Sequence, residues 1–146
     1  MTAFHAGLGI ALVAVNLAAG LWGGWCWWRY RQGRGFWPLL RIGQGLVMLQ
    51  AIDGALLLLI GRDLPDLHLI YGLVPLGVSF VAEQLRIVTA ETVMAQRELE
   101  GRADVEALPE AEQRELVRAI LRREMGVMAA SALVVAALGV RASGWP

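Results

Sequence analysis

The chain has 146 residues, of which 57% are hydrophobic, and its 13 basic and 13 acidic residues leave no formal net charge. This length fits one domain, and the composition is typical of a membrane protein. The zero net charge argues against a nucleic-acid partner, which would require an excess of basic residues. A single cysteine, Cys26, excludes an internal disulfide bond and offers no cysteine-based metal motif.

Two long apolar segments begin the chain and predict transmembrane helices at residues 4–28 and 36–61. Each segment is longer than the roughly 20 residues that a helix needs to cross a bilayer. Tryptophans crowd the end of the first segment and are followed by Arg29, Arg31 and Arg34. Tryptophans mark the membrane interface, and short arginine-rich loops stay in the cytoplasm. We therefore expect the N-terminus outside and this loop inside.

The second half of the chain predicts two further transmembrane helices, at about residues 66–86 and 124–141, with a helical hairpin at 87–123 between them. Arginines flank both predicted spans on the side of the hairpin, which places the hairpin in the cytoplasm. We therefore expect an all-α membrane protein. Its four transmembrane helices form an up-down bundle in a bacterial inner membrane, both termini lie outside, and the antiparallel hairpin forms a cytoplasmic stalk.

Capping residues predict the boundaries of the later helices. Asp66 is a typical N-cap for the third helix. Residues 85–100 contain neither glycine nor proline, so this helix is expected to continue until Gly101 stops it. Residues 102–108 are then expected to form a linker, and Pro109 suits the first position of the next helix.

A polar stripe follows the third predicted helix. His68, Tyr71, Pro75, Ser79 and Glu83 recur at intervals of three or four residues, which places them on one helical face. Polar side chains within a membrane span face the interior of the protein. This face is therefore expected to look inward, and Pro75 is expected to kink the helix.

The second predicted helix also carries polar residues. Arg41 on this helix and Glu83 on the third predicted helix lie at matching depths near the inner face, which favours a structural ion pair. Gln50 and Asp53 lie one turn apart, closer to the outer face. A hydrogen-bonded network within the core is the favoured interpretation of these two, and a proton or quinone contact is the alternative.

The two histidines, His5 and His68, are predicted at the outer ends of the first and third helices. These helices are diagonal neighbours in an up-down bundle, so two imidazoles there can fill both axial positions of a haem, such as haem b. Asn16 lies on the same face as His5, and Arg62 and Arg141 lie on the outer side, where haem propionates favour a cation. Four glycines would leave room for a flat macrocycle: Gly7, Gly9, Gly54 and Gly72.

Residues 49–54 (LQAIDG), with His68 following after a short turn, resemble one segment of the haem A synthases, in which a glutamine and a glycine precede a histidine. In that family each half is a four-helix bundle with a pair of histidines towards the outer face. The resemblance covers residues 4–81 and implies a haem site at His5 and His68. The family's glutamates beside the first-helix histidine are absent, and Ala6 replaces a frequent arginine, so the resemblance implies haem binding rather than haem modification.

Two other interpretations of the histidines remain open. Histidines at a bilayer interface often act only as amphipathic anchors. A mononuclear metal site would combine His5 and His68 with Asp63 or Asp66, and such ligands suit zinc or copper.

The functional alternatives belong to different classes. One is a scaffold or accessory subunit of a larger membrane complex, which would bind a membrane-protein partner or a second copy through the stalk or through the helix-one glycines, Gly20, Gly23 and Gly24. Another is a small oligomeric transporter or channel built around Asp53. The sequence singles out no catalytic residue, which favours a protein that is not an enzyme.

Overall fold

The computed structural model describes residues 3–31, 33–62 and 66–144. Within these ranges the chain forms five helices: α1 (Ala3–Trp28), α2 (Phe36–Leu59), α3 (Asp66–Ala95), α4 (Arg102–Ala107) and α5 (Glu110–Ala142). The helices α1, α2, α3 and α5 are long and apolar enough to cross a membrane. The predicted all-α class and the four candidate membrane spans are therefore confirmed.

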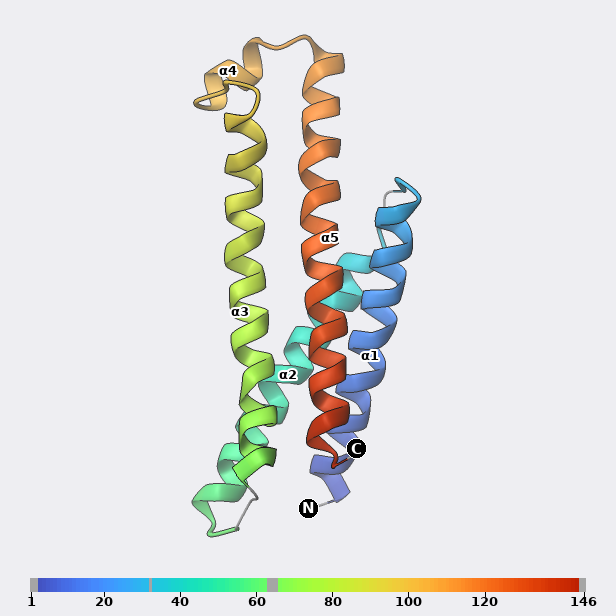
Figure 1. Ribbon diagram of the computed structural model, residues 1–146, viewed down its shortest axis with the longest axis vertical. Coiled ribbons are helices and arrows are strands. Elements are labelled where there is room, and N and C mark those ends of the chain that lie inside the picture. The colour runs from blue at the N-terminus through green and yellow to red at the C-terminus, as the bar shows by residue number, and fades with distance from the viewer. Residues whose placement is uncertain (1–2, 32, 63–65, 145–146) are drawn as a thin grey trace.

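The four long helices lie side by side and alternate in direction along the chain (Figure 1). α1 packs extensively against α2 and α5, and α3 packs extensively against α5, whereas α2 and α3 touch more lightly. α1 and α3 thus lie across the bundle from each other. We name the end that contains His5, His68 and both termini the histidine end, and the end that contains Arg41, Arg86 and Arg122 the arginine end.

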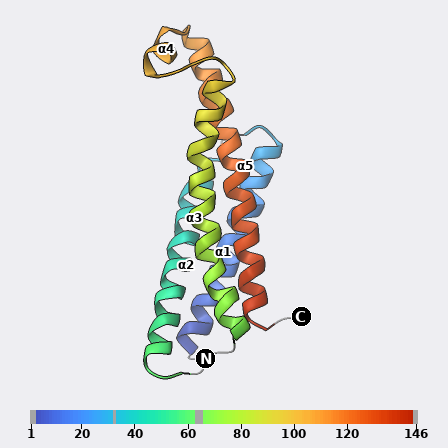
Figure 2. The same cartoon turned by 60° about the vertical axis from the view of Figure 1, so that its left-hand side comes forward.

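Beyond the arginine end, α3 and α5 extend past α1 and α2 and are joined through α4 at the tip (Figures 1 and 2). We call this extension the stalk (residues 87–121). Val93 on α3 and Leu116 on α5 are buried within it. Its exposed surface carries intrahelical ion pairs, such as Arg114 with Glu110 at 2.9 Å, which suit a helix face in water.

The end of α3 differs from the sequence prediction. The helix stops at Ala95, about a turn and a half before Gly101. Glu98 adopts a positive φ of 57°, and the N–H of Leu99 donates to the carbonyl oxygen of Met94 at 3.1 Å. This left-handed turn satisfies a terminal carbonyl group, as glycine usually does at a helix end. A glutamate in that position gives no sequence signal.

The predicted linker at residues 102–108 contains the short helix α4, so this part of the prediction is wrong. The carboxylate of Asp104 accepts hydrogen bonds from the N–H groups of Glu100 at 2.8 Å and Gly101 at 3.2 Å. These bonds fix the start of α4, because an acidic residue at the third helical position can bind the N–H groups before the helix. Pro109 then caps α5 instead of occupying its first helical position.

Glycines allow close helix packing near the arginine end. A Cβ atom added to Gly20 would lie 2.5 Å from Leu133 of α5, and one added to Gly23 would lie 2.4 Å from the ring of Phe36. Both glycines are therefore occupied by contacts within the chain. A Cβ atom on Gly24 would meet no atom within 4 Å, so of the three glycines considered for a partner helix only Gly24 has open space.

Candidate ligand site between the two histidines

The histidine end brings the two imidazole rings together. The ring centroids of His5 on α1 and His68 on α3 are 5.8 Å apart, and the ring planes make an angle of 51°. His5 is 3% exposed, and His68 is half-buried. The two residues come from diagonal helices and meet because both lie within the first turn of helices that start at the same end (Figure 1).

Each ring is held through its Nδ1 atom. The Nδ1 of His5 lies 2.7 Å from a carboxylate oxygen of Asp53, and the Nδ1 of His68 lies 2.9 Å from the carbonyl oxygen of Ala142. Carbonyl and carboxylate oxygens accept hydrogen bonds, so each Nδ1 carries a proton and donates it. In this tautomer the Nε2 of each ring holds a lone pair, which is the arrangement found in metal-binding histidines.

Gln50 adds an amide group beside His5. Its Nε2 lies 3.0 Å from the Nε2 of His5 and 3.4 Å from the carbonyl oxygen of His5. The side-chain oxygen of Gln50 is buried, and within the part of the chain that is described it has no hydrogen-bond partner. A buried oxygen without a partner costs about 1–3 kcal/mol. This oxygen is therefore available to a donor group of a ligand or of water.

A cavity of about 290 Å³ lies between these side chains and receives residues from all four long helices. Its polar groups are the two histidines, Gln50 and the phenol of Tyr71, and the rest of the lining is largely apolar. Several of its lining residues are small: Gly9, Ala51, Gly54, Ala55, Gly72 and Gly139. An apolar cavity with a few convergent polar groups is the usual form of a small-molecule site.

Only some of the four glycines expected beside a macrocycle line the cavity. Gly9, Gly54 and Gly72 line the cavity, as the macrocycle hypothesis requires, whereas Gly7 lies outside its lining. Gly139 on α5 joins them without any sequence signal, because nothing in the sequence predicts which face of α5 meets the histidines.

The two arginines expected near haem propionates differ in their surroundings. The guanidinium of Arg141 is 5.9 Å from the ring centroid of Tyr71, so Arg141 lies beside the cavity. Arg62 is exposed in the turn after α2. Asp63 falls outside the described residues, and Asp66 is exposed at the start of α3. Among the residues that the structure describes, no group of three His, Cys, Asp or Glu could hold a metal ion, so the metal site with Asp66 is not assembled.

Asn16 lies in the middle of the bundle, away from the histidines. Its side-chain amide donates to the carbonyl oxygens of Leu12 at 2.9 Å and Gly43 at 3.4 Å. A Cβ atom on Gly43 would lie 2.8 Å from the Asn16 oxygen, so the glycine permits this contact. Asn16, which is 1% exposed, therefore joins α1 to α2.

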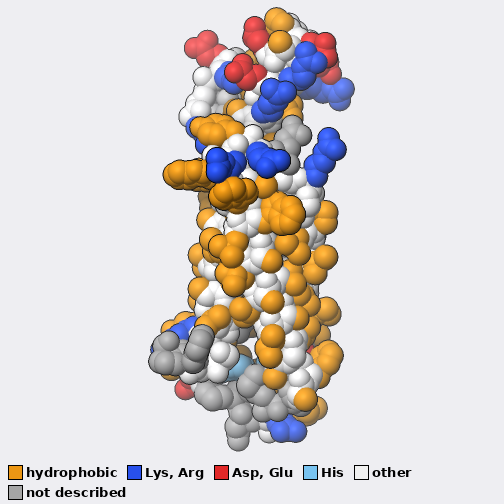
Figure 3. All heavy atoms as spheres, turned by 90° about the vertical axis from the view of Figure 1, so that its right-hand side faces the viewer, with side chains coloured by type: hydrophobic (Ala, Val, Ile, Leu, Met, Phe, Trp, Pro, Cys, Tyr) orange, Lys and Arg blue, Asp and Glu red, His pale blue; other side chains and the backbone are white. Residues whose placement is uncertain are grey.

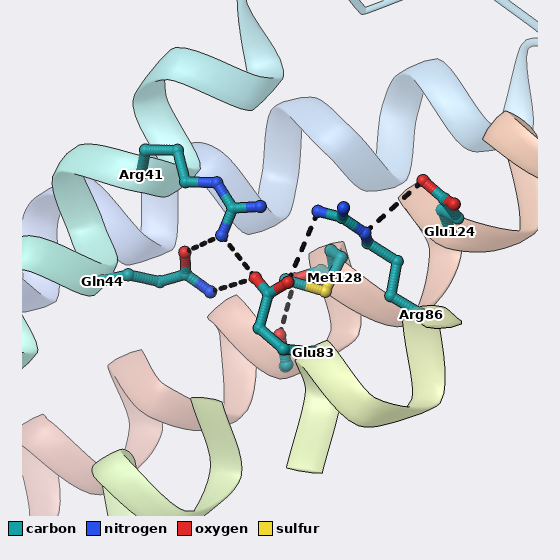
Figure 4. Close-up of polar contacts among 7 residues, drawn as sticks. Arg41, Gln44, Glu83, Arg86, Glu124 and Met128 are labelled. Carbon is teal, nitrogen blue, oxygen red and sulfur yellow. Dashed lines mark hydrogen bonds and ion pairs between the residues drawn. The ribbon is translucent and has the colours of Figure 1, made fainter. Parts of the chain in front are cut away.

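A charged network lies at the arginine end, where α2, α3 and α5 meet (Figure 4). Arg41 forms an ion pair with Glu83, and Gln44 donates to the same carboxylate at 2.9 Å. Arg86 lies 3.4 Å from Glu83 and 3.7 Å from Glu124. Each charge in the network meets an opposite one. The network therefore joins α2 to α3, which otherwise touch only lightly, and it also joins α3 to α5.

The contacts of Asp53 and Ala142 with the histidines were not predicted from the sequence. Asp53 and His5 lie at similar depths from the same membrane face, and this matching depth was the available signal. Ala142 acts through its backbone carbonyl group, which every residue has, so no signal existed for it.

Comparisons with protein-family models, with curated proteins and with solved structures find no match to this chain. The interpretation of the site therefore depends on its own chemistry.

Proposed function

We propose that this chain is an integral membrane protein that binds a haem b between His5 and His68, as a small electron-transfer or accessory redox protein. The observation that carries the proposal is the pair of neighbouring imidazoles, each fixed through Nδ1. Both rings belong to the same cavity lining, and His5 and His68 would hold the haem iron there. The ring centroids are 5.8 Å apart, so the two rings are close enough to act on one ligand.

The ligand set also favours a macrocycle over a bare ion. Two histidines fill only two of the four positions of a zinc ion, and among the described residues no third His, Cys, Asp or Glu completes a metal site with them. A porphyrin supplies four nitrogens of its own, and the bound haem would contribute one-electron chemistry at its iron. Asp53 and Ala142 would orient the two ligand rings, and Arg141 lies where a propionate favours a cation.

The size of the cavity sets a condition. Its volume of about 290 Å³ lies at the lower end of the range for small-molecule sites, about 300–1,000 Å³. Haem binding therefore requires α2 and α3 to separate at the histidine end, and these are the two neighbouring helices that touch most lightly. The hydrogen bond between Gln50 and the Nε2 of His5 must also open.

For the membrane placement, we propose an up-down bundle in a bacterial inner membrane with the stalk in the cytoplasm and both termini outside. Support comes from arginines gathered above a band of hydrophobic side chains (Figure 3). Trp25 and Trp28 are exposed at this level, and the guanidinium of Arg29 lies 4.7 Å from the Trp25 ring. Tryptophans gather at membrane interfaces, and arginines in short loops favour the cytoplasmic side, which supports this orientation.

The test is an absorption spectrum of the protein purified in detergent from haem-replete cells. A Soret band is expected, and His68→Ala should lose it while keeping the helical circular dichroism signal. Gln44→Ala, which changes the arginine end, is the control and should keep the band. Haem added to the purified protein gives a second measurement. A colourless protein that binds no added haem, or His68→Ala with an unchanged spectrum, would overturn the proposal.

A second candidate function is an accessory subunit that docks through the stalk. The observation that favours it is the exposure of apolar side chains at its base: Ile87, Val88 and Val117 are each about half exposed. Val88→Arg with Val117→Arg should then release a membrane-protein partner on native gels, and unchanged migration would contradict docking. The transporter hypothesis gains no support, because the carboxylate of Asp53 is engaged by His5.

A further inference from the structure

The arginine end contains a second hollow, a groove of about 620 Å³ between the end of α1, the loop after it and α5. Four arginines and one glutamate line it: Arg31, Arg97, Arg118, Arg122 and Glu115. The arginines come from three parts of the chain, because Arg31 follows α1, Arg97 follows α3, and the other two lie on α5. This convergence gives the groove a net positive charge.

Most of this charge is not neutralised by the protein. Within residues 3–31, 33–62 and 66–144, no ion pair involves Arg31, Arg97 or Arg118. All three side chains are exposed. The remaining cation, Arg122, is held in place by aromatic groups instead of a carboxylate. Like-charged side chains around one hollow repel each other, so an anion within it would be stabilised.

Arg122 is fixed in a geometry suited to binding. Its guanidinium lies 3.6 Å from the ring centroid of Tyr30 and 5.5 Å from that of Trp27. Its Nε also donates to the carbonyl oxygen of Trp27 at 3.5 Å. Stacking on the rings immobilises the planar group, so less entropy is lost when the remaining N–H groups bind an oxyanion.

The groove is amphipathic along its length. From Met125 to Glu115 it follows α5 for about 15 Å at the usual rise per residue. Met125, Cys26 and Trp27 form its apolar part at the level of the tryptophan belt, and the arginines lie further towards the stalk. A phosphate group next to the arginines and an acyl chain next to the apolar part would match this order.

We propose that the groove binds the headgroup of an anionic glycerophospholipid from the adjacent membrane leaflet. Arginine forms paired hydrogen bonds with phosphate, and basic pockets at the cytoplasmic side of membrane helices suit such headgroups. The net positive charge discriminates against zwitterionic lipids. This proposal depends on the four helices spanning a membrane but is independent of haem binding, which concerns the opposite end.

The experiment measures lipid retention on the purified full chain by native mass spectrometry, with added phosphatidylglycerol or phosphatidylcholine. The wild-type protein should retain phosphatidylglycerol about tenfold more strongly than phosphatidylcholine. Arg31→Gln with Arg118→Gln should remove this preference. The matched control, Arg102→Gln with Arg114→Gln, removes the same charge from the stalk outside the groove and should keep it. Arg31→Gln alone changes only the loop after α1 and no helix, and it should reduce the preference for phosphatidylglycerol.

Three outcomes would overturn the proposal. The first is equal retention of the two lipids by the wild type, and the second is an equal loss of the preference for phosphatidylglycerol in the control variant. The third is displacement of phosphatidylglycerol by millimolar glycerol 1-phosphate, which would indicate a soluble phosphate ligand. The Soret band of Arg31→Gln with Arg118→Gln should equal that of the wild type, so a failure at this groove is distinguishable from a failure at the histidine site.

Discussion

The two ends of the bundle both carry polar groups within apolar helices, but they arrange them differently. At the arginine end, outside the arginine-lined groove, the charges alternate along Arg41, Glu83, Arg86 and Glu124, and each meets an opposite charge. At the histidine end the polar groups converge on a cavity, and the Gln50 oxygen has no partner among the described residues. A closed network of this kind stabilises the fold, whereas an open one has bonding capacity left for a ligand.

The glycines at the two ends show the same contrast. Near the arginine end, Gly20 and Gly23 are glycines because neighbouring side chains occupy the space of a Cβ atom. At the histidine end, a Cβ atom on Gly54 would lie 3.7 Å from His5, and one on Gly72 would meet nothing within 4 Å. Gly20 and Gly23 therefore permit close packing, and Gly54 and Gly72 leave space. Gly139 at the histidine end also packs closely, because a Cβ atom there would lie 2.7 Å from Val13, so the role of each glycine depends on the neighbouring helix.

The largest effect is expected from Gly23→Leu. The new side chain would overlap the ring of Phe36, which is fully buried and has no room to move. Overpacking costs up to about 3 kcal/mol, so the variant should unfold at a much lower temperature. Gly24→Leu, one residue along the same helix, is the matched control and should unfold close to the wild type. Equal unfolding temperatures for the two variants, measured by tryptophan fluorescence in detergent, would contradict close packing here.

The next effect tests the histidine end. Asp53→Ala removes the carboxylate that accepts the Nδ1 proton of His5. A hydrogen bond to a charged group contributes about 1.5–3 kcal/mol, so unfolding in denaturing detergent should begin at a lower concentration. Asp53→Asn keeps an acceptor oxygen and should lose less than half as much. If the two variants behave alike, the charge matters and the hydrogen bond does not.

Much of the fold was predictable from the sequence because it depends on local and repeated signals. Long apolar runs, tryptophans at their ends and arginine-rich loops predict the four long helices to within a few residues at most boundaries. The missed features have weak signals. Glu98 ends α3 in a backbone conformation that glycine usually adopts, and α4 is a helix of six residues fixed by one carboxylate, Asp104.

The candidate site was predictable only in part. The pairing of His5 with His68 follows from helix direction and depth, which the apolar runs determine. The bond between Asp53 and His5 depends on the rotation of α2 about its own axis, and the few polar residues of that mostly apolar helix do not determine the rotation. The position of Gly139 on the cavity wall depends in the same way on the rotation of α5, which the sequence does not determine.

A smaller effect is expected at the arginine end. Glu83→Gln removes the negative charge between Arg41 and Arg86 but keeps an oxygen that can accept a hydrogen bond. The side chains of Arg41 and Glu83 are 49% and 30% exposed, so solvent screens the pair, and a loss of about 1 kcal/mol is expected. Added salt should shrink the difference from the wild type. Glu91→Gln, on an exposed part of the same helix, is the control, and an equal loss there would contradict a specific role for Glu83.

The smallest effect, and the one of opposite sign, is expected from Gly72→Ala. A Cβ atom there meets no neighbour, so only the intrinsic preference of alanine for helix acts, and stability should rise by about 0.5–1 kcal/mol. Because Gly72 lines the cavity, the same methyl group narrows the space between the histidines, and haem should bind more weakly to the more stable protein. Unfolding temperature and haem titration on one preparation measure both quantities. A loss of stability would mean that α3 packs closely at this end, and the contrast between the glycines of the two ends would then fail.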